Sequence, residues 1–137
     1  MLLQVVYRVV SMPYVVDLLP GPRVIRVVFD GEVSLQDRSG ALANLIELQA
    51  ESSFRNVLVD LTKASLIDAS NSETLEYAVR LAREPIVRHV HIAYVGDPAL
   101  GTSVECVAAT RGYFYRRFRS QASALLWFSA DRSRRAA

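Results

Sequence analysis

The chain has 137 residues, of which 51% are hydrophobic and 22% are charged, and its formal net charge is +2. This composition is typical of one packed domain and excludes the class of weakly hydrophobic, highly charged chains that stay disordered. The single cysteine, Cys106, cannot form an internal disulfide, and no apolar run approaches the roughly 18 residues of a membrane-spanning helix. We therefore expect a cytoplasmic protein without a membrane span.

The two ends of the chain differ from its middle. Residues 1–11 contain apolar side chains without a regular period, and they can be interpreted as an N-terminal extension or as an extra edge strand. The domain itself is predicted over residues 12–131, followed by a basic C-terminal tail at 132–137. Arginines are concentrated from Arg111 onward, an asymmetry that can indicate an anionic partner. Because no nucleic-acid-binding pattern accompanies them, we expect no nucleic-acid partner.

The first predicted elements are a hairpin and a helix. Two β-branched runs, at 14–18 and 23–29, flank a turn sequence that contains two prolines and a glycine, which predicts two antiparallel strands. Ser34 is the expected N-cap of the following helix, with Gln36 and Asp37 in its first turn. Apolar residues spaced by three and four predict the buried face of this helix: Leu42, Leu45, Ile46 and Leu48.

The rest of the chain alternates between strands and helices. An apolar run at 56–61 predicts a central strand covered on both faces. A helix is expected after Asp68, with a buried stripe that ends before Pro85 and consists of Leu75, Ala78, Val79 and Ala82. Further strands are predicted at 87–95 and 113–119, and further helices from near Gly101 and at 120–131. This order predicts a single α/β domain with a mixed, mainly parallel sheet of about five strands and four helices.

The segment from Val57 to Asn71 resembles the hallmark segment of STAS domains, which are anti-sigma-factor-antagonist-like modules. In that family a strand ends in Asp-Leu and an Asp-Ser-Ser-Gly turn opens a helix; Asp60-Leu61 and Asp68-Ala69-Ser70-Asn71 occupy those places here. Phe118-Arg119 followed by Ala124 to Phe128 is similar to the ending of short stand-alone STAS-like bacterial proteins.

The resemblance implies a STAS-like domain that docks onto a protein partner, such as an anti-sigma or kinase-like regulator. In some members of the family, docking is switched by phosphorylation of the second serine of the turn. Ser70 matches that serine, while Ala69 and Asn71 replace the first serine and the glycine of the family pattern.

Candidate site residues gather around this turn. Ser70, next to Asn71, is expected to cap free N–H groups at the start of the helix. A phosphate on Ser70 would bring roughly two negative charges to the positive helix end and would repel an acidic partner surface. Asp60 and Asp68 are expected at the carboxyl end of a parallel strand or in its following loop. There they could hold Mg²⁺, share a proton, or form turn and cap hydrogen bonds.

Three other places could carry chemistry. His89 and His91 are two apart on a predicted strand and would point to the same face, but a third metal ligand is missing, so no metal site is predicted. The loop that includes Gly101, Thr102 and Ser103 precedes a helix, which makes it either a generic anion or ligand loop or an ordinary turn. No cofactor is expected.

These residues favour a non-enzymatic regulatory module that binds a protein through the Ser70 turn and the helix that runs to Glu84, and a homodimer is allowed. An enzyme is not expected because no nucleophile, base or metal set can be assembled. The alternative is a carrier or sensor of an apolar small molecule or lipid, held between the sheet and the last helix. Aromatic clustering near the C-terminus motivates this alternative: Tyr113, Phe114, Tyr115, Phe118, Trp127 and Phe128.

Overall fold

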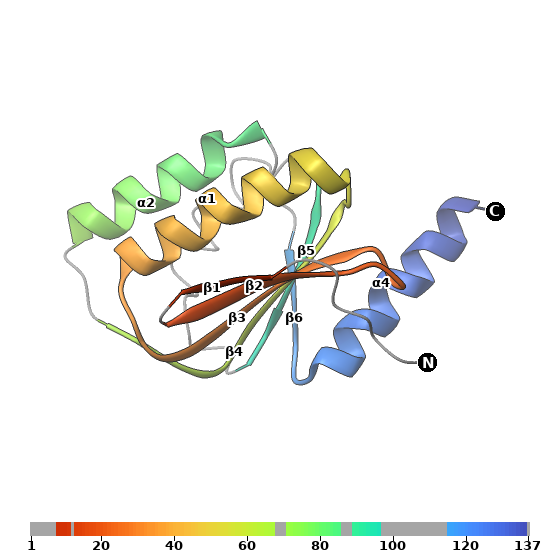
Figure 1. The fold of residues 1–137 in the computed structure, drawn as a ribbon, viewed down its shortest axis with the longest axis horizontal. Helices are drawn as coiled ribbons and strands as arrows, with labels where there is room; N and C mark the ends of the chain where they lie inside the picture. Colours follow the sequence, from red (N-terminus) through yellow and green to blue (C-terminus); the bar gives the residue numbers. More distant parts are fainter. Residues whose placement is uncertain (1–7, 12, 68–70, 86–88, 97–114, 137) are drawn as a thin grey trace.

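The computed structural model describes residues 8–11, 13–67, 71–85, 89–96 and 115–136. These residues form one six-stranded sheet with the strand order β1-β2-β3-β4-β5-β6. Two helices cover one face of the sheet and one helix covers the other (Figure 1). The elements in chain order are β1 (Arg8–Ser11), β2 (Tyr14–Leu19), β3 (Val24–Val33), α1 (Leu35–Ser52), β4 (Asn56–Leu66), α2 (Asn71–Arg83), β5 (His91–Val95), β6 (Tyr115–Phe118) and α4 (Gln121–Ala136).

The predicted hairpin is confirmed. β2 and β3 are antiparallel, and Leu19 lies opposite Val24, so four residues make the turn. The Arg23 backbone N–H closes this turn by donating to the Pro20 carbonyl at 3.3 Å. Residues 8–11 add β1 to the outside of β2, also antiparallel. The assignment of residues 1–11 and the domain bounds at 12 and 131 stay predictions.

The other three strand pairings, β3 with β4, β4 with β5 and β5 with β6, are parallel, so the sheet is mixed as predicted. The run at 56–61 forms the first part of β4, which lies between β3 and β5. The described sheet has six strands because β1 adds to the five predicted ones. The fourth helix, predicted from near Gly101, lies outside the described residues.

α1 begins where the sequence predicts. Ser34 is its N-cap: the Ser34 hydroxyl accepts from the Asp37 N–H at 3.0 Å, and the Asp37 carboxylate accepts from the Ser34 N–H at 2.9 Å. This reciprocal capping box satisfies two backbone donors that the first turn leaves open. The predicted face of the helix is buried at Leu42, Leu45 and Leu48.

Several predicted bounds were wrong. β5 begins at His91, because His89 and Val90 lie in a turn and a bend before it. α4 runs past the predicted end at Asp131 to Ala136. An arginine-rich segment readily extends a helix at its C-terminal end, because arginine has high helix propensity and its positive charge interacts favourably with the helix dipole there.

Two hydrophobic clusters lie on opposite faces of the sheet. The larger one joins α1 and α2 to the side chains of β2 to β5 that point toward them. The smaller one joins α4 to the side chains on the other face of the sheet, and its buried members are Leu19, Val24, Leu58, Ala93, Val95, Ala124 and Phe128. Figure 1 shows α1 and α2 side by side on one face and α4 on the opposite face.

Candidate functional site

Asp60 lies inside β4 and not at the carboxyl end of that strand, as the sequence had suggested, because β4 continues to Leu66. The register between β3 and β4 shifts directly after Asp60, where a β-bulge sets two residues of β4, Leu61 and Thr62, against Phe29 of β3. The Asp60 carboxylate accepts from the Thr62 N–H at 2.8 Å and from the Thr62 hydroxyl at 2.7 Å. This carboxylate therefore satisfies a backbone donor at the bulge.

A chain of polar side chains runs from Asp60 across the sheet to the hairpin. Gln121, the first residue of α4, donates to Asp60 at 2.6 Å and accepts from Arg26 at 3.4 Å. Arg26 in turn makes two hydrogen bonds to Asp17, at 3.0 and 2.8 Å. Asp17 is buried, and Arg26 is only partly exposed. The sequence analysis missed this network, although the hairpin register places Asp17 opposite Arg26.

The outer face of α2 carries an apolar stripe that the sequence analysis had assigned to the core. Among the α2 side chains that the structure describes, Ala78 is buried as predicted and Leu81 is buried as well, while Leu75 is 56% exposed. The buried stripe is thus shifted by one residue, which is about 100° of helix rotation. Tyr77 explains the shift, because its ring is half-buried and lies 4.9 Å from the guanidinium carbon of Arg38 on α1.

A groove of about 440 Å³ runs along α2. Leu75 and Val79 are the apolar residues that line it. The other described residues along this groove are charged, namely Glu76, Arg80, Arg83 and Glu84. This face therefore combines two apolar residues with four charged ones.

The turn that the STAS resemblance highlights lies directly before α2. Asp68 and Ser70 fall outside the described residues, and Asn71 is the first residue of α2. Ile67, the last described residue before the turn, is 48% exposed. Gly101, Thr102, Ser103 and Cys106 lie outside the described residues as well.

The predicted pairing of His89 with His91 was wrong, because His89 lies in the turn before β5 and only His91 belongs to the strand. The His91 ring lies 5.9 Å from the Trp127 ring of α4. Among the residues that the structure describes, no group of three or more histidine, cysteine, aspartate or glutamate side chains could hold a metal ion.

Aromatic side chains fill the space between the sheet and α4, where the sequence analysis had placed an alternative apolar ligand. Trp127 lies 5.4 Å from Phe118 and 5.2 Å from Phe128 between ring centres, and Phe128 is 1% exposed. Phe118, Trp127 and Phe128 therefore pack against one another as part of the hydrophobic cluster on this face.

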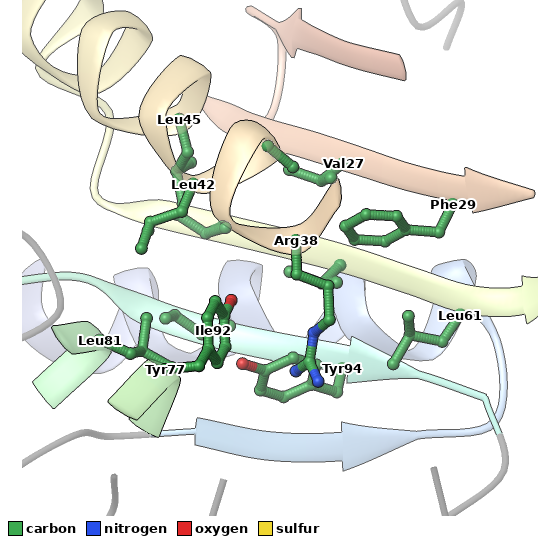
Figure 2. Close-up of a pocket in the computed structure, with 13 residues that line it drawn as sticks. Val27, Phe29, Arg38, Leu42, Leu45, Leu61, Tyr77, Leu81, Ile92 and Tyr94 are labelled. Carbon is green, nitrogen blue, oxygen red and sulfur yellow. The ribbon is translucent and has the colours of Figure 1, made fainter. Parts of the chain in front are cut away.

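A cavity lies on the opposite face, between α1, α2 and the sheet. Figure 2 shows the side chain of Arg38 reaching into it beside Tyr77 and Tyr94, among apolar residues of α1 and the strands. Its volume is about 50 Å³. A space of that size holds a few water-sized groups and is far below the roughly 300 Å³ or more of a ligand pocket, so it does not favour a lipid carrier.

No family model matches the chain, and no curated protein matches it. Among solved structures, the chain is similar to an uncharacterized protein of the DUF3478 family with a SpoIIAA-like fold from Shewanella loihica PV-4, at 16% sequence identity and a TM-score of 0.49. That alignment covers 93% of this chain and 96% of the other.

Within the part of the chain that the structure describes, each helix is too short or too polar to cross a membrane.

Proposed function

We propose that this protein is a regulatory module that binds a protein partner through the outer face of α2 and the turn before it. The observation that carries the proposal is the exposure of Leu75 on a face that also contains Val79 and several charged residues. Ile67, just before the turn, adds a second exposed apolar side chain. The resemblance of the Asp68 to Asn71 segment to the STAS turn supports the same surface.

The energetics favour docking at this face. Burying a fully exposed leucine side chain contributes roughly 1.5–3 kcal/mol, and Leu75 can contribute about half of that because it is 56% exposed in the free protein. Charged residues beside the apolar stripe select the partner and its orientation more than they add affinity. The bound surface of the partner is therefore expected to be apolar at its centre, with acidic groups that complement Arg80 and Arg83.

Phosphorylation of Ser70 is part of the proposal. Ser70 directly precedes the first residue of α2, so a phosphate there would lie at the positive end of the helix dipole. The added negative charge would weaken binding to an acidic partner surface next to the turn. Docking would then depend on the phosphorylation state of one residue.

The proposal contains no catalytic step. Asp60 supports this view, because its carboxylate oxygens accept three hydrogen bonds from Thr62 and Gln121 and so have a role within the fold. This view is also supported by His91, which packs against Trp127.

The test is an affinity capture from the host with three tagged proteins: wild type, Leu75→Glu and Leu126→Glu. Leu126 is a matched control because it is an exposed leucine, at 70%, on α4 at the opposite face of the sheet. A partner identified with wild type is then purified, and its Kd is measured with each variant. We expect Leu126→Glu to bind like wild type and Leu75→Glu to bind at least about tenfold more weakly. Equal affinity of Leu75→Glu and wild type would exclude the α2 face.

Two further variants test the switch with the same purified partner. Ser70→Asp adds negative charge, and Ser70→Asn keeps a capping side chain of similar size without the charge. We expect weaker binding for Ser70→Asp and unchanged binding for Ser70→Asn. If the two variants bind equally well, charge at position 70 does not control docking, although the α2 surface can still be the binding face.

A further inference from the structure

Charges are ordered along the outer face of α2. Glu76 lies in the first half of the helix, and Arg80 and Arg83 lie in the second half. All three side chains are exposed and line the groove that also contains Leu75 and Val79. The groove therefore has Glu76 before the midpoint of the helix and Arg80 and Arg83 after it, with Glu84 directly beyond the last helical residue.

We infer that α2 of one copy of this chain pairs antiparallel with α2 of a second copy. A two-fold axis near Val79 brings the apolar stripes of the two copies together. Such an axis also brings Glu76 of one copy toward Arg80 and Arg83 of its partner copy, and each of these contacts occurs twice. A parallel arrangement would instead place like charges beside each other, so the charge order favours the antiparallel one.

The size of the face sets the strength of the pairing. α2 has 13 residues, so it is about 20 Å long at roughly 1.5 Å per residue. Contact through one helix on each side falls below the roughly 1,200 Å² of total buried surface that stable complexes reach. The dimer is therefore weak, with a Kd between about 1 μM and 1 mM, and it forms only at high local concentration.

Self-pairing covers the same residues that the proposed function assigns to partner docking. The two events exclude each other, so free partner and a second copy compete for α2. The pairing itself rests on the order of Glu76, Arg80 and Arg83 and on the exposed Leu75 beside the half-buried Val79, and it needs no partner. The competition rests on the proposed function.

The test uses the purified full chain alone, in sedimentation equilibrium over a range of protein concentrations. We expect reversible dimers of wild type that weaken as salt screens the ion pairs. Glu76→Arg should weaken association at least about tenfold, because both symmetric contacts become repulsive. Inverting all three charges, with Glu76→Arg, Arg80→Glu and Arg83→Glu together, should restore association. Leu126→Glu is the control and should not change it.

Two results would overturn the inference. One is a wild-type chain that stays monomeric at about 1 mM, beyond the weak limit of the expected range. The other is a dimer that Glu76→Arg leaves unchanged, which would place the contact elsewhere. Circular dichroism of each variant checks that the fold is intact. If the wild-type chain self-associates as expected but captures no partner, the proposed function is contradicted and the self-pairing of α2 is not.

Discussion

The two faces of the sheet are covered in different ways. On the α4 face, Ala124 and Phe128 are almost fully buried, and Gln121 ties the start of the helix to the polar network on β2, β3 and β4. On the other face, a cavity of about 50 Å³ remains beneath α1 and α2. The sheet is thus closely packed and linked by polar side chains on the α4 side, whereas the α1 and α2 side retains an unfilled space.

The largest change in the free energy of unfolding is expected from a substitution in the polar network on the α4 face. Arg26→Met removes both hydrogen bonds to Asp17 and leaves a carboxylate that is 1% exposed without its cation. We expect the free energy of unfolding to fall by about 3 kcal/mol, as for other ion pairs broken on one side. Urea denaturation with a constant m value measures this change.

A double variant serves as the control for this loss. Arg26→Met combined with Asp17→Leu removes the buried charge together with its partner, and the stability should return to within about 1 kcal/mol of wild type. If Arg26→Met alone unfolds at the same urea concentration as wild type, the network does not stabilise the fold.

A smaller difference in stability is expected between matched alanine-to-leucine substitutions on the two faces of the sheet. Ala124 on α4 and Ala41 on α1 are both buried helical alanines, but only Ala41 borders the cavity. We expect Ala124→Leu to cost about 1–3 kcal/mol, because the packed face has no room for a larger side chain. Ala41→Leu should cost under about 1 kcal/mol, since its added atoms can enter the cavity. Similar losses for both variants, measured by urea unfolding, would contradict the difference between the faces.

The smallest effect concerns the contact of α1 with the hairpin. A Cβ atom added at Gly40 would lie 2.9 Å from the Tyr14 hydroxyl, which accepts a hydrogen bond from Asn44 at 3.2 Å. Glycine to alanine inside a helix normally stabilises by roughly 0.5–1 kcal/mol, and we expect Gly40→Ala to lose that gain to the clash. In a Tyr14→Phe background the gain should reappear. Thermal unfolding of the two single variants and the double variant tests this, and additive effects would show that the clash is relieved in another way.

The sequence predicted those parts of the fold well that depend on interactions between residues close together in the chain. The two prolines and the glycine fixed the hairpin, and the reciprocal capping of Ser34 and Asp37 fixed the start of α1. The bulge after Asp60 and the long second half of β4 could not be predicted, because they depend on pairing with β3. The pairing of Asp17 with Arg26 could have been predicted, because the register of the hairpin places these two polar residues opposite each other in otherwise apolar strands.

The candidate surface was harder to predict because α2 contains two overlapping apolar stripes. Leu75 and Val79 form one, and Tyr77, Ala78 and Leu81 form the other. Helical spacing fits both, so period alone cannot choose the buried one. The contact of Tyr77 with Arg38 of α1 decides it, and that contact joins residues far apart in the sequence.

The bulged strand β4 has a consequence for how the α2 surface is held. β4 pairs with β5 only as far as Asp60, whereas it stays paired with β3 to Leu66. Beyond the bulge, the described sheet narrows to a two-stranded arm, and α2 follows from the tip of this arm. An isolated pair of strands twists and bends more easily than a wide sheet. The arm is therefore the part of the described sheet that bends most easily, whereas Ala78 and Leu81 hold the second half of α2 in the core.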